Sequence, residues 1–349
     1  MSQLELADAC LWQAGWAERL GSPLYHALLI RIREDVLAGG ACWRVLESHA
    51  GKPDRALPLR FLAVVHRLVL EDRLPELARY YPSAGGTADA AGVWHAFAAQ
   101  AEQHAGELSA RMPATVQTNE VSRCCALLPG FLAIAGHTGL PMRLLEIGCS
   151  AGLNLRWDCF CYATPAGMWG DPASLVRFGN VFTGETPALH AAVTISDRRG
   201  CDLNPIDPTT EDGRLTLLSF VWPDQAERFQ QLSAATEVAR RVPVELTRSD
   251  AVVWLRSQLA GANAGVATVV FHSVVRPYLG QESCDRLDAI LREAGERATR
   301  EAPLALLAME PAEKDAAVDL TLWPGSERRR IAEAGFHGRP VNVLAASLR

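Results

Sequence analysis

The sequence has no excess of positive charge. Its 34 Lys and Arg residues are outnumbered by 40 Asp and Glu, which gives a formal net charge of −6. The basic runs at 198–199 and 328–330 are short, as on solvated helix or loop faces. Nucleic-acid-binding proteins usually present a basic surface that neutralises phosphates, so the composition predicts no nucleic-acid partner.

Long apolar runs are missing near the start of the chain. The first twenty residues, MSQLELADACLWQAGWAERL, contain early acids and have the spacing of an amphipathic helix. A signal peptide or a membrane span needs a continuous apolar stretch. We therefore expect neither of them, no membrane partner, and a cytoplasmic location.

The cysteine pattern argues against two further kinds of site. Nine cysteines without a secretory signal indicate free thiols rather than a disulfide framework. The close pairs Cys124-Cys125 and Cys159-x-Cys161 lack the spacer and the second pair of a typical zinc site. We expect no metal ion.

Apolar residues are plentiful, at 49% of the 349 residues, and their spacing changes along the chain. Steps of three and four residues, as in 59–70, predict an all-helical N-terminal domain over 1–135 that could act as a lid or hold substrate. After Pro141 short apolar runs alternate with amphipathic segments, which is typical of α/β proteins. Residues 136–349 therefore predict a doubly wound, mostly parallel sheet with a polar, glycine-rich insertion at about 163–192.

The expected elements follow from the same pattern. The expected strands are 143–147, a run ending at Asp202, 244–246, 266–274 and 304–310, and the expected helices are 152–160, 223–241, 281–300 and one that begins at Ala251. Residues 326–344 are expected to form a helix followed by a strand.

The segment LLEIGCSAGLNL, residues 144–155, supports two interpretations. Gly148-Cys149-Ser150-Ala151-Gly152 matches the G-x-S-x-G turn of serine hydrolases, and Asp250 followed by His272 or His337 keeps their residue order. In those enzymes several strands and an oxyanion-hole loop precede the nucleophile, whereas a helical region precedes it here. A serine hydrolase that uses Ser150 is therefore the alternative hypothesis.

The second interpretation is a nucleotide-binding turn. Glu146, Gly148, Ser150 and Gly152 resemble motif I of class I S-adenosylmethionine-dependent methyltransferases, an acid followed by a glycine-rich turn between the first strand and the first helix. In that family the glycines let the backbone approach the ligand closely. Ser150 departs from the pattern because glycine is usual there, but its hydroxyl can still hydrogen-bond the amino-acid part of the ligand.

Two later acids extend this resemblance. The segment GCDLNPID places Asp202 at a strand end, where the resemblance implies a bond to the ribose hydroxyls, although an Asp-Leu-Asn-Pro turn remains open. Asp202 lies much further from the glycine turn than the usual distance of about 20 residues. In TRSDAVV, Asp250 would accept from the adenine amino group and Ala251 would offer its backbone N–H. Asp250 is equally suited to helix N-capping.

Other polar groups complete the expected site. His272, at the end of the most apolar strand, is a candidate general base, and Tyr278 a second catalytic candidate. In QTNEVSR, Asn119 and Glu120 are expected to cover the glycine turn, or else to cap a helix.

Taken whole, the sequence resembles an uncharacterised bacterial family that shares QTNE, LLEIG-x-SAGLNL, DLNP, VWPDQ, FHSVV and HG-x-PV. This resemblance implies only the methyltransferase-like (Rossmann-like) fold. Trp222 and Asp224 of VWPDQ are candidates for the ligand mouth. The sequence thus predicts an S-adenosylmethionine-binding protein that methylates a small or medium nucleophilic substrate; a non-catalytic nucleotide-binding module is a further alternative. It indicates neither the methyl acceptor nor the oligomeric state.

Overall fold

A computed structural model describes residues 1–51, 54–113, 115–185, 187, 189–261 and 263–344. The chain forms two compact units, which we call the helical unit (Met1–Thr118 and Thr210–Ser233) and the sheet unit (Asn119–Thr209 and Ala234–Arg349). Residues 119–135 thus lie in the sheet unit, and the later segment 210–233 joins the N-terminal helices. Helix α10 (Ala226–Ala239) begins in the helical unit and continues into the sheet unit.

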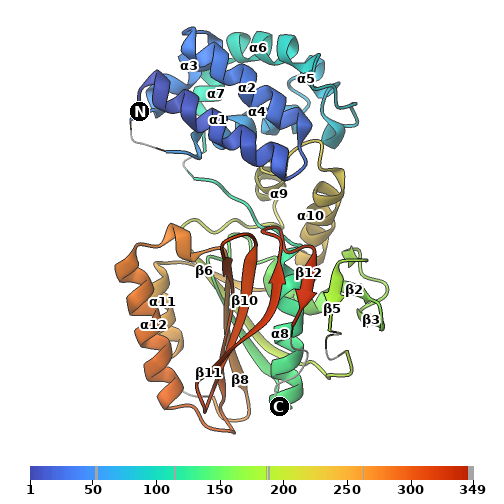
Figure 1. The fold of residues 1–349 in the computed structure, drawn as a ribbon, viewed down its shortest axis with the longest axis vertical. Coiled ribbons are helices and arrows are strands. Elements are labelled where there is room, and N and C mark those ends of the chain that lie inside the picture. The colour runs from blue at the N-terminus through green and yellow to red at the C-terminus, as the bar shows by residue number, and fades with distance from the viewer. Residues whose placement is uncertain (52–53, 114, 186, 188, 262, 345–349) are drawn as a thin grey trace. The chain divides into compact units, whose positions relative to one another are not determined.

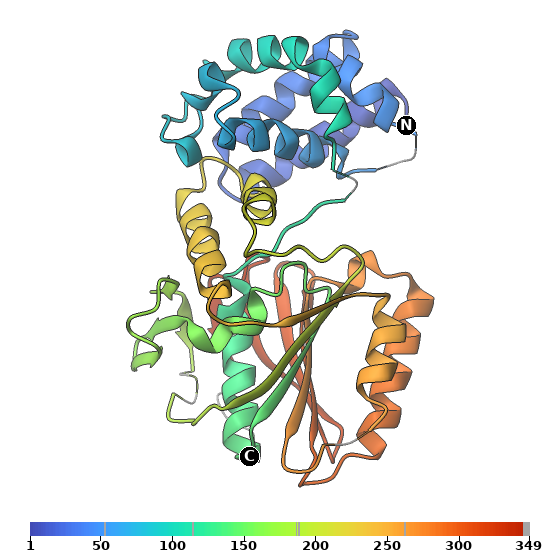
Figure 2. The same cartoon turned by 180° about the vertical axis from the view of Figure 1, so that it is seen from behind.

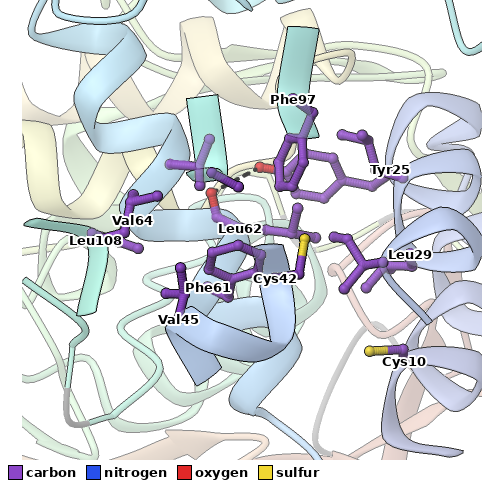
Figure 3. Packing of buried hydrophobic residues seen from close by; sticks show 14 of the residues in the cluster. Cys10, Tyr25, Leu29, Cys42, Val45, Phe61, Leu62, Val64, Phe97 and Leu108 are labelled. Carbon is purple, nitrogen blue, oxygen red and sulfur yellow. Dashed lines mark hydrogen bonds between the residues drawn. The ribbon is translucent and has the colours of Figure 1, made fainter. Parts of the chain in front are cut away.

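The described residues of the helical unit form helices and no strand, which confirms the predicted helical N-terminal region. Helix α4 is buried on most sides, as its apolar composition requires. Figure 3 shows Phe61 and Leu62 of α4 among side chains of neighbouring helices, with the Tyr25 hydroxyl donating to the Leu62 carbonyl at 3.5 Å. The helices are α1 (Gln3–Arg19), α2 (Pro23–Leu37), α3 (Ala41–Leu46), α4 (Leu57–Leu70), α5 (Pro75–Ala78), α6 (Val93–Gln103), α7 (Ala105–Ala110) and α9 (Glu211–Ser219), with 3-10 turns η1 (Glu47–His49) and η2 (Pro82–Ala84).

The VWPDQ motif lies in the later segment of the helical unit, where it has a packing role. The Asp224 carboxylate accepts from the Ser22 hydroxyl at 2.6 Å and from the Leu24 amide at 3.0 Å, at the start of α2. Trp222 is 9% exposed within the apolar core and lies 6.2 Å from the Tyr25 ring. Asp224 therefore stabilises a helix start, where free amides need an acceptor.

The sheet unit contains a nine-stranded sheet in the order β5-β12-β11-β10-β9-β8-β1-β6-β7. Strands β7, β6, β1, β8 and β9 run parallel, which confirms an α/β architecture with a large, mostly parallel sheet. The strands of this sheet are β1 (Met142–Ile147), β5 (Phe182–Gly184), β6 (Ile195–Asp202), β7 (Glu245–Arg248), β8 (Ala267–Ser273), β9 (Leu304–Pro311), β10 (Ala316–Trp323), β11 (Glu327–Ala334) and β12 (Val341–Val343).

Two expected helices are wrong. Residues 327–334 form strand β11, antiparallel to β10, instead of a helix. Asp319 of β10 pairs with Arg328 and Arg330 across the strands, so a charge pattern that suits a helix face serves here as a ladder of cross-strand pairs. After the glycine turn the chain forms only the short 3-10 helix η3 (Asn154–Cys159).

Helices cover both faces of the nine-stranded sheet. Figure 1 shows α11 (Ala251–Gln258) and α12 (Gln281–Glu296) on one face and α8 (Arg123–Thr138) on the other. On α8, a Cβ at Gly130 would lie 2.3 Å from Leu307 of β9, so glycine permits the close approach of this helix. The insertion region contains a three-stranded sheet of β2 (Cys161–Thr164), β3 (Gly167–Gly170) and β4 (Arg177–Phe178), on the α8 side in Figure 2. Among the described residues, no helix combines the length and the apolar character needed to cross a bilayer.

Candidate functional site

The parallel strands end together at one edge of the sheet, which we call the carboxyl edge. Strand β1 lies between β6 and β8: the chain continues outward from β1 through β6 to β7 on one side, and from β8 to β9 on the other. Strand order therefore reverses at β1. In open α/β sheets, ligands bind outside the carboxyl ends of the strands at such a point.

The glycine turn directly follows β1. Gly148, Ser150 and Gly152 all have left-handed backbone, with φ of +67°, +49° and +63°. The amides of Gly148 and Cys149 both donate to the carbonyl of Cys201, at 2.9 and 3.0 Å, which joins the turn to β6. The turn is thus a fixed part of the sheet edge, and its serine adopts a conformation that favours glycine.

The glycines of the turn are required by packing inside the sheet unit. A Cβ at Gly148 would lie 2.6 Å from Val275, and one at Gly152 would lie 2.8 Å from Leu246. Side chains at either position would need these neighbours to move.

Asp202 lies at the end of β6 and contacts the turn directly. Its Oδ2 accepts from the Ser150 amide at 2.9 Å, and its Oδ1 accepts from the Asn204 amide at 2.8 Å. The second bond forms the Asx turn that the DLNP sequence allows. Each carboxylate oxygen has a second lone pair, so these two bonds do not exhaust the acceptor capacity of Asp202.

The structure also brings Asn119 to the turn. Its Oδ1 accepts from the amides of Ala151 and Leu153, at 3.2 and 3.0 Å. Glu120 instead accepts from the Ser122 hydroxyl at 3.0 Å, beside the first residues of α8. Both residues are 8% exposed, so Asn119 and Glu120 brace the carboxyl edge from within the sheet unit.

Glu146, near the end of β1, is 2% exposed, and its Oε2 has no hydrogen-bond partner. Burial raises the pKa of this carboxyl well above its ordinary value; Asp202 adds to the rise, while Arg156 and a bond from Asn154 oppose it. The side chain of Arg156 donates to the carbonyls of Gly152 and Val242, both at 2.8 Å. Burial therefore favours the neutral form of the Glu146 carboxyl, although the buried cation of Arg156 opposes this effect.

Asp250 begins helix α11 and acts as its N-cap. Its Oδ1 accepts from the amides of Val252 and Val253, at 2.9 and 3.1 Å. Ala251 is the first residue of that helix. The capping role left open by the sequence is thus present, and an adenine contact from Asp250 or Ala251 stays a prediction.

His272 is 5% exposed in β8, and its Nδ1 lies 2.6 Å from Oε1 of Glu310, on β9. The residue after the strand, Val274, has a φ of +56°, which is rare for a β-branched side chain. The other catalytic candidate, Tyr278, is 80% exposed in the 3-10 turn η4 (Arg276–Tyr278). The structure does not bury Tyr278 with His272.

Several residues of the edge escaped prediction from the sequence. Glu310 and Arg156 contact predicted residues but belong to no predicted motif, and Asn154, within the segment 144–155, was given no role. Glu310 had a usable signal, because it is the last but one residue of an apolar strand, just as Glu146 is. In the described part of the chain, no three His, Cys, Asp or Glu side chains gather as metal ligands would.

The chain belongs to a bacterial family described as "Uncharacterized protein conserved in bacteria (DUF2332)", which matches residues 7–342. The match covers both units, including every residue discussed above. Comparisons with curated proteins and with solved structures gave no match.

Proposed function

We propose that the sheet unit binds S-adenosylmethionine at the carboxyl edge and transfers its methyl group to a small or medium nucleophile. The order β7-β6-β1-β8-β9 supports this proposal. Counted along the chain these strands are 3-2-1-4-5, as in the Rossmann order 3-2-1-4-5-6, in which nucleotides bind at the switch point beside the first half, 3-2-1.

One observation carries the proposal: the bond of 2.9 Å between the Ser150 amide and the Asp202 carboxylate. It joins the turn after the first strand of this half to the acid that ends the second. In nucleotide-binding units of this type, the turn receives the charged part of the ligand and the acid receives the ribose hydroxyls. Asp202 retains lone pairs for such a bond.

The buried polar groups fit a ligand of this kind. The unpartnered Oε2 of Glu146 lies on the strand that leads into the turn, and a buried polar atom without a partner costs about 1 to 3 kcal/mol unless something compensates. Glu146, Gly148, Ser150 and Gly152 would hold the amino-acid part of the cofactor, and Asp202 its ribose. When bound, the cofactor supplies an electrophilic methyl group. The protein would contribute positioning and exclusion of water.

Calorimetry tests this assignment. Wild-type protein is expected to bind S-adenosylmethionine or S-adenosylhomocysteine, and Asp202→Asn should weaken binding by about 1 to 3 kcal/mol because a charge-assisted bond is lost. Asp197→Asn is the matched control, since Asp197 lies on the same strand at its other end. Unchanged affinity in Asp202→Asn would remove this acid from the site, and no binding by wild type would remove the proposal.

A serine hydrolase is the second candidate, favoured by the backbone of Ser150. Its φ of +49° is the kind of strain found at the nucleophile of a G-x-S-x-G elbow. Against it, Ser150 is 5% exposed, and two of the three residues predicted to serve it have other partners: Asp250 caps α11 and His272 meets Glu310. Stoichiometric labelling of Ser150 by a fluorophosphonate probe would favour the hydrolase. Ligand binding without turnover would instead favour a binding module.

A further inference from the structure

We propose that Glu310 and His272 form a carboxylate–histidine pair. Glu310 positions the imidazole, and His272 acts as the general base that removes a proton from the methyl acceptor. The acceptor is then a protic group, an O–H or an N–H, rather than a carbon or a sulfide. This inference rests on the proposed transferase function and names the substrate class for that same site.

The Glu310 carboxylate is held by backbone amides as well as by the His272 ring. Oε1 of Glu310 accepts from the amides of Val275 and Arg276, at 3.0 and 3.3 Å, as well as meeting His272 Nδ1 at 2.6 Å. Glu310 on β9 therefore holds both the histidine of β8 and the loop that follows it. Val274 lies in that loop, and its left-handed backbone is a strain that persists only where surrounding contacts impose it.

The pairing determines which nitrogen of the neutral ring is free. A carboxylate only accepts hydrogen bonds, so Nδ1 must carry the proton that it donates to Glu310. The lone pair of the neutral imidazole is then on Nε2, and this nitrogen is the base. Burial by itself raises the pKa of Glu310, but the bonds from His272, Val275 and Arg276 outweigh it and lower the pKa below its ordinary value.

The charged side chains near His272 bond to other groups, and Glu310 is the hydrogen-bond partner of the His272 ring. Arg276 and Asp288 of α12 form a two-bond ion pair, at 2.8 Å for each bond. From α8, Arg123 donates to the Ser273 carbonyl at 2.9 Å, beside His272. In the step, the X–H bond of the acceptor breaks, its electron pair stays on X, and the proton moves to Nε2. The imidazolium that forms is stabilised by the Glu310 carboxylate.

Nitrogen-15 NMR measures the tautomer of the His272 ring directly. The His272 signal is assigned by its loss in His272→Asn. Wild type above neutral pH should show the Nδ1–H tautomer. Glu310→Ala should shift the population toward Nε2–H, and Glu310→Gln, which keeps an acceptor oxygen for the loop amides, should restore part of the Nδ1–H population. Asp288→Asn is the matched carboxylate control and should leave the tautomer unchanged.

Activity gives the second readout. With a panel of hydroxyl, amine and thioether acceptors, transfer should occur only to protic ones and should fall about 10²-fold or more in Glu310→Gln. S-adenosylmethionine affinity should stay within about twofold of wild type, since Glu310 is not among the proposed cofactor ligands. An Nε2–H tautomer in wild type, or transfer to thioethers, would overturn the inference. Failure of wild type to bind the cofactor would instead overturn the proposed function.

Discussion

The parallel strands begin at one edge of the nine-stranded sheet, which we call the amino edge, and end at the carboxyl edge. The two edges differ in whether their polar side chains have hydrogen-bond or ion-pair partners. At the amino edge an open hollow of about 770 Å³ is lined by residues that include Arg143, Asp197 and Arg199. These charges are paired: Arg143 and Arg199 both pair with Asp197, at 3.4 and 2.7 Å, and Arg199 also pairs with Glu245 at 3.5 Å. A large hollow here coincides with polar groups that already have partners.

The carboxyl edge has the opposite character. Glu146 and Glu310 each have a buried oxygen without a partner, and within the described residues they are the two buried carboxyl groups of this kind. Ser150 and Val274 nearby hold left-handed backbone without being glycine. Buried unpaired groups and strain are costs that folding alone does not explain. Buried carboxyl groups without a partner therefore distinguish the carboxyl edge, as the candidate site, better than the size of a hollow does.

The largest expected effect comes from the close packing of the carboxyl edge. Gly338 has a φ of +80°, and a Cβ there would lie 2.3 Å from the Ser122 carbonyl oxygen and 2.4 Å from Arg123 Cα. Backbone atoms cannot move aside cheaply, so Gly338→Ala should lower the free energy of unfolding by about 3 kcal/mol or more. Urea denaturation measures this loss.

Gly139 provides the matched control at the amino edge. It ends α8 with a φ of +63°, and nothing lies within 4 Å of its Cβ position. Gly139→Ala should therefore lose only the conformational part, about 1 to 2 kcal/mol. Equal losses in the two variants would contradict the claim that the HG-x-PV segment is tightly fitted to α8.

The second-largest effect is expected at Glu146, the buried acid of β1, and concerns the pH dependence of stability. Because burial raises the pKa of Glu146 in the folded state, the folded protein holds this proton more tightly than the unfolded chain does. The free energy of unfolding should then fall as the pH rises above about 4.5, by up to about 1.4 kcal/mol per pH unit. Glu146→Gln removes this titration, so the variant should gain stability relative to wild type as the pH rises.

Glu327→Gln, at the start of β11 on the amino edge, is the matched control substitution. A bond from Arg329 lowers the pKa of this exposed carboxyl, which gives the opposite sign: its small contribution is present above pH 4.5 and is lost as the pH falls. Thermal unfolding of both Glu→Gln variants between pH 4 and 8 measures the two slopes. Parallel curves for wild type and Glu146→Gln would contradict the raised pKa of Glu146.

The sequence predicted the carboxyl edge in outline because strand ends leave local signals. Glu146 and His272 nearly end apolar runs, Asp202 precedes the turn sequence Leu-Asn-Pro, and parallel strands bring such ends to one edge. Glu310 was missed as a partner because its bond to His272 joins residues 38 positions apart. No local spacing encodes such a pair.

The same limit explains the errors elsewhere. Strand β11 has a helix-like charge pattern, and only its pairing with β10 makes it a strand. The capping role of Asp224 was missed because its partners Ser22 and Leu24 lie about 200 residues away in the chain, and its place at a ligand mouth stays a prediction. A carboxylate at an unassigned position looks the same in sequence whether it caps a distant helix or binds a ligand.

The smallest expected effect is the change in stability when glycine replaces Ser150 and relieves its backbone strain. Left-handed backbone at a non-glycine residue costs about 1 to 2 kcal/mol, while glycine adds about 0.5 to 1 kcal/mol of unfolded-state entropy, so Ser150→Gly should stabilise the fold by about 1 kcal/mol or less. Ser326, in the β10–β11 turn at the amino edge, has a φ of +52° and is the matched serine. Ser326→Gly should give a similar small gain in thermal unfolding.

Function should distinguish the two serines where stability does not. If Ser150 belongs to a ligand-binding turn, Ser150→Gly keeps the amide that donates to Asp202, and S-adenosylmethionine binding should persist or tighten. If Ser150 is a nucleophile, the same change removes the attacking oxygen and should abolish both esterase activity and fluorophosphonate labelling. Ser326→Gly should alter neither. We expect retained binding, because glycine keeps the amide that donates to Asp202, and no labelling of wild type, because Ser150 is only 5% exposed.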